Sequence, residues 1–404
     1  MTRSTHPPTR AEALARLSDF VPRAGRDYAG KRNHDLPGHP HVSVLSPYIR
    51  HRLVTEEEVL QAVLGRFALS SAEKFVQEVF WRTYWKGWLE MRPSVWPDYQ
   101  RGVSGAVDRV QTEAGLRGDW EAACQGETGI EAFDHWAREL VETGYMHNHA
   151  RMWFASIWIF TLRLPWELGA DFFLRHLLDG DPASNTLSWR WVAGLQTRGK
   201  NYVARASNIS KYTDGARQVG YALDTSPAPL DGPPHPPRMD PPTGDWMEPG
   251  RKTGLLLTEE DLSPGFLLDA IAPEATFVLT GTPGRSPLMV SDAVSAFTEG
   301  AIADCLARFG GRLGDVAGPS TDFAEAEAWA RKGGFEQIVV PYAPVGPASE
   351  AVSALTRALV GDIPVRRVMR PYDAMCWPFA TAGFFKFKEK IPRLIGDLKG
   401  LRAA

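Results

Sequence analysis

Apolar and polar positions follow two different periods along this 404-residue chain. In the first half, apolar residues recur at steps of three and four, the spacing of a helix with one buried face. Thr55 followed by three glutamates is typical of a helix N-cap with an acidic first turn. The pattern predicts helices at 55–67, 71–89, 131–143, 148–163, 166–178 and 184–196.

The second half changes period. Short apolar runs predict buried strands at 253–257, 276–280, 336–341 and 363–368, with helical patterns between them at 290–309, 321–333 and 348–360. Such alternation is typical of a parallel sheet covered by helices. No Gly-rich dinucleotide fingerprint accompanies these strands.

A proline-rich segment at 222–251 separates the two patterns. Neither a helix nor a central strand can continue through such a segment, so we expect an extended linker or a strap on a neighbouring domain. The predicted fold class is therefore α+β multidomain. An all-α domain at 1–221 is followed by the linker and by a smaller, Rossmann-like α/β domain at 252–395.

Composition narrows the function classes only slightly. A hydrophobic share of 44% and a charged share of 23% are ordinary for a globular protein. The net charge of −3 gives no nucleic-acid signature, although a local basic rim would suffice for DNA binding. No apolar run is long enough to span a membrane, and the N-terminus lacks the apolar stretch of a secretory signal.

The three cysteines lie far apart and have no metal-ligand spacing. We expect free thiols in a reducing cytoplasm, and no metal site.

Residues 144–191 are the most informative stretch. Polar side chains stand there within a Trp- and Phe-rich helical sequence, namely Asn148, Arg151, Asp179, Asp181 and Asn185. Carboxylates and amides among aromatic rings are costly unless a partner satisfies them. The motifs GYMHNHARM, DGDPASN and WRW resemble the flavin-binding core of the photolyase/cryptochrome family.

Other motifs resemble the same family in the same order. The segment HVSVLSPYIR at 41–50 is similar to its phosphate-binding loop, with Val42 in place of the usual Thr. The segments EVFWRTYW at 78–85 and GETGIEAFDHWAREL at 126–140 also match. The resemblance implies an FAD cofactor held by Tyr28, Arg32, Ser43, Leu45, Ser46, Trp81, Asn148, Arg151, Asp179, Asp181 and Asn185.

The resemblance also implies roles for these side chains. In the family the Arg pairs with the first Asp, the carboxylates address the flavin N3–H and ribityl region, and the last Asn faces flavin N5. Catalytic residues would then be Glu78, Asn148, Trp166, Trp189 and Asn185. Trp189 and Trp166 match the inner members of a tryptophan chain that feeds electrons to photoexcited flavin, whereas the outer member is not recognisable.

A pocket for a flipped-out pyrimidine dimer would be formed by Glu78, Trp81, Arg82, Met152 and Trp191, together with Asn148. His149 departs from the family, which usually has an Arg there in contact with DNA phosphate. Arg198, Lys200, Arg205 and Lys211 could form a phosphate-contacting rim or an ordinary solvated face.

Three functions are compatible with the resemblance. The first is an enzyme, a photolyase that repairs cyclobutane pyrimidine dimers in DNA with blue light and reduced FAD. The main alternative is a cryptochrome-like photoreceptor that signals through a protein partner, and the third is a permuted, light-inactive flavoprotein scaffold. The α/β region follows the helical region here, the reverse of the family order, so a circularly permuted antenna domain with a second chromophore of open identity is a further hypothesis. The absence of a cysteine quartet argues against the family's iron–sulfur branch.

Overall fold

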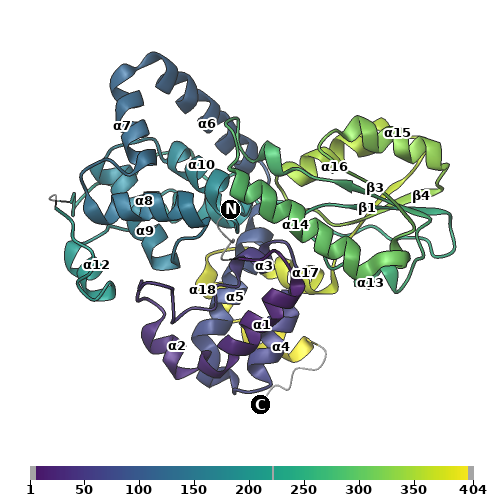
Figure 1. Cartoon of the computed structure of the whole chain (residues 1–404), viewed down its shortest axis with the longest axis horizontal. Coiled ribbons are helices and arrows are strands. Elements are labelled where there is room, and N and C mark those ends of the chain that lie inside the picture. The colour runs from purple at the N-terminus through teal and green to yellow at the C-terminus, as the bar shows by residue number, and fades with distance from the viewer. Residues whose placement is uncertain (1–5, 221–222, 399–404) are drawn as a thin grey trace.

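The computed structural model describes residues 6–220 and 223–398. Helices form one side of the molecule, and a parallel sheet covered on both faces forms the other (Figure 1). The helical side begins with α1 (Arg10–Phe20), η1 (Val21–Arg23), α2 (Arg26–Lys31), α3 (Ser46–Arg50), α4 (Glu56–Leu64) and α5 (Leu69–Glu90). It continues with α6 (Val95–Thr112), α7 (Ala114–Gln125), α8 (Glu131–Thr143), α9 (Asn148–Ser156), η2 (Ile157–Thr161), α10 (Trp166–His176), α11 (Pro182–Ala193) and α12 (Ala206–Tyr212).

Every predicted helix of this half is confirmed within a few residues. Thr55 caps α4 as a complete capping box with Glu58. The helix predicted at 148–163 changes at Ile157 from α9 into the π-helical turn η2. Helices α6 and α7 were not predicted.

The sheet contains five parallel strands in the order β3-β2-β1-β4-β5. These are β1 (Thr253–Leu257), β2 (Ala275–Leu279), β3 (Asp315–Ser320), β4 (Gln337–Pro341) and β5 (Val365–Val368). The remaining helices of this half are α13 (Gly265–Leu268), η3 (Thr282–Arg285), α14 (Asp292–Phe309), η4 (Gly310–Leu313), α15 (Phe323–Gly333) and α16 (Pro347–Ala358). The predicted fold class, a helical region followed by a parallel α/β region, is confirmed.

Strand β3 was not predicted, because it carries no buried apolar run. It lies at the edge of the sheet, is mostly exposed and contains Pro319. An edge strand needs only one hydrogen-bonded neighbour, so it tolerates proline and polar residues that a central strand excludes.

The chain returns to the helical side after β5. Helices α17 (Pro371–Cys376), α18 (Phe384–Lys388) and α19 (Ile391–Asp397), with the turn η5 (Trp377–Phe379), all contact α5. Gly87 allows this approach, since a Cβ there would lie 2.9 Å from the Trp377 Cα. These last helices thus pack on the helical side, although the sequence grouped them with the sheet.

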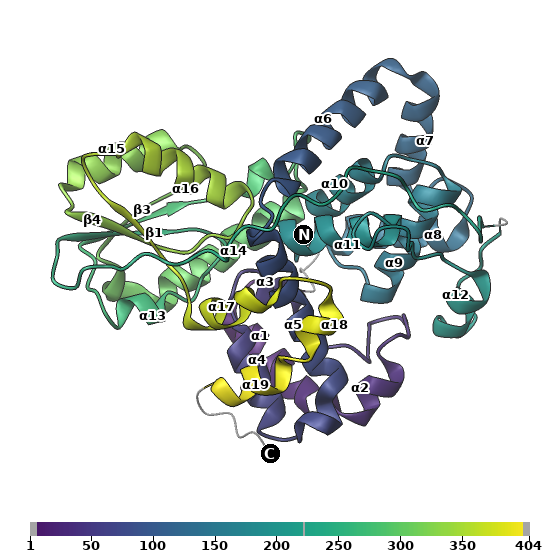
Figure 2. The same cartoon turned by 180° about the vertical axis from the view of Figure 1, so that it is seen from behind.

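The described part of the proline-rich segment forms neither helix nor strand. The Leu230 N–H donates to the Ala193 carbonyl (2.9 Å), the Met239 N–H to Met91 (2.9 Å), and the Asp245 N–H to Arg367 (2.7 Å). Figure 2 shows this strap crossing the helical side and reaching the sheet. The domain boundary predicted between residues 221 and 222 lies outside the described residues, and the other boundaries stay predictions.

One apolar core joins the two sides. Leu255 and Leu257 of β1 pack in the same cluster as helices α1, α4 and α5, whereas Leu256, on the opposite face, packs beneath α15 and α16. Because alternate strand residues face opposite ways, one face of the sheet packs toward the helical side, and the other packs against α15 and α16.

Candidate functional site

An arginine–carboxylate pair connects α9 to the loop before α11. Arg151 Nη2 donates to Asp179 Oδ2 (2.8 Å), and Arg151 Nε donates to the Met146 carbonyl (2.9 Å). The second carboxylate oxygen, Asp179 Oδ1, is buried and has no hydrogen-bond partner among the described residues. A buried acceptor without a donor is costly. The site therefore fits a ligand that donates a hydrogen bond there, as a flavin N3–H would.

Asp181, two residues later, is already engaged by the protein. Its carboxylate caps α11 by accepting from the Ser184 N–H (2.8 Å), and it lies 2.8 Å from Lys86 Nζ and 3.1 Å from Arg82 Nη1. Burial alone would raise the pKa of Asp181, but Lys86, Arg82 and Arg50 hold that pKa well below its usual range. Lys86, which the sequence reasoning missed, makes Asp181 a structural anchor of α11.

Asn185 is held in one orientation. Its Nδ2 donates to the Ala170 carbonyl (2.8 Å) across to α10, and the residue is buried. The amide oxygen has no hydrogen-bond partner within residues 6–220 and 223–398, so it is the atom left to meet a ligand.

The residues predicted to bind the phosphates differ in how exposed they are. The Leu45 N–H donates to Ser43 Oγ (3.4 Å), Leu45 is buried, and Ser46 begins α3 with its side chain exposed. Tyr28 packs edge-on against Phe20 and Phe75, and burial raises its pKa. In this structure Tyr28 is a core residue, whereas Ser46 is accessible.

The substrate residues predicted on α5 have protein partners. Glu78 forms an ion pair with Arg32, which directly follows α2, and the Glu78 side chain is 28% exposed. Burial raises the pKa of Glu78, and Arg32 opposes that rise. Trp81 stacks on Phe384 of α18, with ring centroids 3.5 Å apart and planes 12° from parallel.

The remaining predicted substrate residues are dispersed. Arg82 forms ion pairs with the buried carboxylates of Asp181 and Glu56. Trp191 stacks on Tyr202 with ring centroids 5.6 Å apart. Met152 is partly exposed, and Asn148 lies exposed at the start of α9.

The His149 side chain also contacts other residues of the protein. Its ring stacks on Trp153 with a centroid separation of 4.1 Å, and its Nδ1 lies 3.1 Å from the Asn33 carbonyl. This histidine therefore helps to fix α9 against the segment that follows α2.

Of the two predicted electron-transfer tryptophans, Trp189 lies in an aromatic layer, whereas Trp166 belongs to a separate group of ring contacts. Trp189 contacts Phe173 and Trp158, with ring centroids 5.1 and 6.2 Å apart. Gly169 makes room for it, because a Cβ there would lie 2.3 Å from the Trp189 ring. Trp166 contacts Tyr99 (5.7 Å), and within the described chain no ring contact joins Trp166 directly to Trp189.

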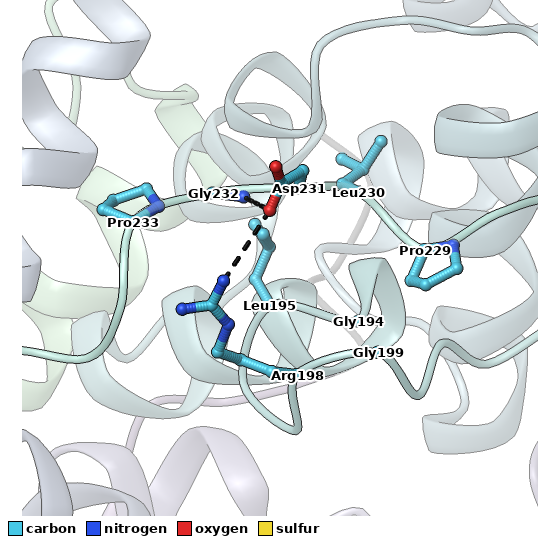
Figure 3. Close-up of a pocket in the computed structure, with 9 residues that line it drawn as sticks. All are labelled: Gly194, Leu195, Arg198, Gly199, Pro229, Leu230, Asp231, Gly232 and Pro233. Carbon is cyan, nitrogen blue, oxygen red and sulfur yellow. Dashed lines mark hydrogen bonds and ion pairs between the residues drawn. The ribbon is translucent and has the colours of Figure 1, made fainter.

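The candidate phosphate rim is less basic than its sequence suggests. Figure 3 shows Arg198 facing Asp231 of the strap across a surface pocket of about 240 Å³, with 3.7 Å between Nη2 and Oδ1. The strap thus places one exposed carboxylate beside one of the four cations of that segment.

Among residues 6–220 and 223–398, no group of three or more His, Cys, Asp and Glu side chains is arranged to hold a metal ion. No helix in the same part of the chain has the length and apolar character needed to cross a membrane.

Comparison with known proteins identifies the helical side. Residues 75–218 match the family model described as the FAD binding domain of DNA photolyase. The deoxyribodipyrimidine photo-lyase of a Synechococcus species is 31% identical over 221 residues, which are 52% of this chain and 44% of that protein. That of Streptomyces griseus is 32% identical over 49% of this chain and 44% of its own length.

A solved class III photolyase from Agrobacterium tumefaciens has 27% identity and a TM-score of 0.42, over 50% of this chain and 42% of that chain. The chain spans less than half the length of the curated relatives that it matches.

Together with the site, the match defines a protein with a helical FAD-binding domain. These findings support the photolyase/cryptochrome family that the motifs indicate, over the helical side of the chain.

Proposed function

We propose that this protein binds FAD and uses blue light to repair cyclobutane pyrimidine dimers in DNA by electron transfer from the reduced flavin. The observation that carries the cofactor assignment is the Arg151–Asp179 pair with its unpartnered, buried carboxylate oxygen. When bound, FAD would supply the photochemistry, while Arg151, Asp179 and Asn185 would orient its ring.

Glu78 supports the repair role. Its side chain is partly accessible beside Trp81, and its pKa is raised by burial. A carboxyl group of raised pKa can donate a proton or a hydrogen bond to a pyrimidine that gains an electron. Arg32 would have to release Glu78 when a dimer binds.

A specific observation favours the alternative, a cryptochrome-like photoreceptor with a protein partner. Phe384 covers one face of Trp81 and closes that face to a pyrimidine ring. Under this alternative, DNA containing dimers is not the substrate.

The α/β side is proposed to be the antenna-like domain in a circularly permuted order, with a second chromophore as an addition to FAD. The compartment we propose is the cytoplasm, because all three cysteines are free and two of them are buried.

The test is light-dependent repair of an oligonucleotide that contains a dimer. Reduced, FAD-loaded protein should remove dimers in blue light and not in the dark. Glu78→Ala should weaken dimer binding and lower repair per absorbed photon, yet leave the flavin spectrum unchanged. Glu78→Gln keeps a hydrogen-bonding side chain and should retain binding better than repair. Equal inactivity of wild type and Glu78→Ala in light would remove the repair proposal in favour of the photoreceptor.

A further inference from the structure

A second line of aromatic rings leads away from Trp166 along α6. The rings of Trp166 and Tyr99 have centroids 5.7 Å apart, and those of Tyr99 and Trp96 have centroids 5.4 Å apart. Trp96 and Tyr99 are three residues apart on one helix, so they share a face. All three side chains are buried. The rings thus form a contiguous path from α10 to the N-terminal end of α6, beside α16.

The path ends at a carboxylate on the opposite side of the molecule. Trp96 Nε1 donates to Glu350 Oε1 (2.8 Å), and Glu350 lies exposed in the first turn of α16. This distance is within the range over which a proton transfers directly. Trp96 itself is 2% exposed, so its only polar atom reaches solvent through Glu350.

We propose that Trp96 is the terminal electron donor of this protein and that Glu350 accepts its indole proton. The inference rests on the proposed light-driven electron transfer, in which photoexcited flavin creates an electron vacancy that reaches Trp166. An electron then passes from Trp96 to the Trp166 radical cation. The Trp96 N–H proton moves to Glu350, which leaves a neutral indolyl radical and a carboxylic acid that releases the proton to water. A one-electron reductant in solution, such as a thiol, restores the electron, and a proton returns from water.

Tyr99 has a different role from its neighbours. Its hydroxyl is buried and has no hydrogen-bond partner among the described residues, and burial raises its pKa well above the usual value. A phenol that cannot release its proton is difficult to oxidise. Tyr99 therefore acts as a bridge between the two tryptophans and carries no long-lived radical.

A competing route starts at Trp166 itself. Trp166 borders a surface cavity of about 600 Å³, through which a reductant could reach its ring directly. In that case Trp96 would be a packing residue, and its replacement would not change the radicals formed after a light flash.

Flash photolysis of the FAD-loaded protein separates the two routes, because neutral and protonated tryptophan radicals absorb differently. Trp96→Phe should abolish the long-lived neutral radical and shorten charge separation several-fold. Tyr99→Phe should change little. Glu350→Gln, which keeps a hydrogen-bond acceptor, should leave the radical protonated and shorter-lived. An unchanged neutral radical in Trp96→Phe or in Glu350→Gln would overturn the proposal.

Trp136→Phe is the matched control. Trp136 is also fully buried and donates its indole N–H to a carboxylate, Asp35 Oδ2 (2.9 Å), but its ring partner is Trp153. This variant should keep the long-lived neutral radical. Loss of that radical in Trp136→Phe as well as in Trp96→Phe would overturn the assignment to Trp96.

A flavin-independent experiment distinguishes failure of this inference from failure of the proposed function. The protein without FAD is oxidised by photogenerated ruthenium(III) tris-bipyridine, in a Trp246→Phe background because Trp246 is 79% exposed. Electron paramagnetic resonance should show a neutral tryptophan radical that disappears in Trp96→Phe and persists in Trp136→Phe. If the protein binds no FAD, the proposed function fails while this result still decides the role of Trp96. A radical unaffected by Trp96→Phe would overturn the inference alone.

Discussion

The surface that joins the sheet to the helices and the aromatic layer around Trp189 are both buried. The first is held by pairs of charged side chains, whereas the second consists of aromatic rings. At the junction, Arg52 Nη2 lies 2.7 Å from Asp373, and its Nη1 lies 3.1 Å from Asp261. Arg50 lies 2.6 Å from Glu260. In the aromatic layer, Trp189 is surrounded by rings, and its buried indole N–H has no hydrogen-bond partner among the described residues.

The contrast shows what each region does. Buried charges in mutual pairs hold two parts of a chain in one geometry, and removing one partner leaves the other uncompensated. In a layer of aromatic rings, replacing one ring by another of similar volume changes stability little, but it changes the redox chemistry of the layer. The junction should therefore respond to substitution through stability, and the aromatic layer through photochemistry.

The largest effect is expected at the junction. Arg52→Ala would leave Asp373 without its arginine, while Asp261 would keep Arg370, and the change should lower the free energy of unfolding by about 3–5 kcal/mol. Arg109→Ala, which breaks the exposed pair with Glu113, is the control and should leave the unfolding midpoint unchanged. Denaturant unfolding measures both. A similar small shift for both variants would mean that the buried pairs do not hold the junction.

The next effect concerns the aromatic layer. Trp189→Phe should abolish most flavin photoreduction, yet change the free energy of unfolding by less than about 1.5 kcal/mol, because the swap roughly keeps volume and loses no hydrogen bond. Trp153→Phe, another fully buried tryptophan, should keep photoreduction. The contrast would break if Trp189→Phe reduced stability and left photoreduction unchanged, since another route would then operate.

The candidate flavin site lies between these extremes, because a charge pair there also faces a ligand. Asp179→Ala leaves Arg151 without its carboxylate and removes an acceptor for the flavin, so FAD affinity should fall about tenfold or more, equivalent to one charge-assisted hydrogen bond of about 1.5–3 kcal/mol. Asp171→Asn, which disrupts the buried Asp171–Arg175 pair, should lower stability without weakening FAD binding. Equilibrium titration with FAD measures both. Full FAD occupancy in Asp179→Ala would remove the assignment of the Arg151–Asp179 pair.

The smallest effect is a pH dependence near the same site. His39 lies 3.5 Å from Asp35 and 3.4 Å from Glu139, with the rings of Tyr145 and His147 beside it. Burial lowers the pKa of His39, but the two carboxylates prevail and raise it to about 9. A raised histidine pKa stabilises the fold fully below the unfolded value of about 6.5, and the stabilisation is lost as pH rises through about 9.

Wild type should thus lose about 2 kcal/mol more stability than His39→Gln between pH 7 and 9.5. Thermal unfolding across that range measures the difference. Parallel pH profiles for the two proteins would show that His39 is not charged in the folded state.

Local patterns in the sequence determined much of this protein. The helical period, the capping box at Thr55 and the apolar runs of β1, β2, β4 and β5 depend on neighbours along the chain, so the two halves and most elements could be predicted. The motifs around Arg151, Asp179 and Asn185 likewise predicted a candidate flavin site, through their resemblance to the photolyase/cryptochrome family.

Only the tertiary structure decided which of those residues meet one another. Asp181 forms ion pairs with Lys86 and Arg82, and Phe384 stacks on Trp81. These partners lie up to about 300 positions apart in the chain. The hydrogen bond from Trp96 to Glu350 joins α6 to α16 across the junction. Pairings of this kind depend on how helices and strands pack. No local sequence pattern predicts them, because each partner, considered within its own segment, is indistinguishable from an ordinary surface or core residue.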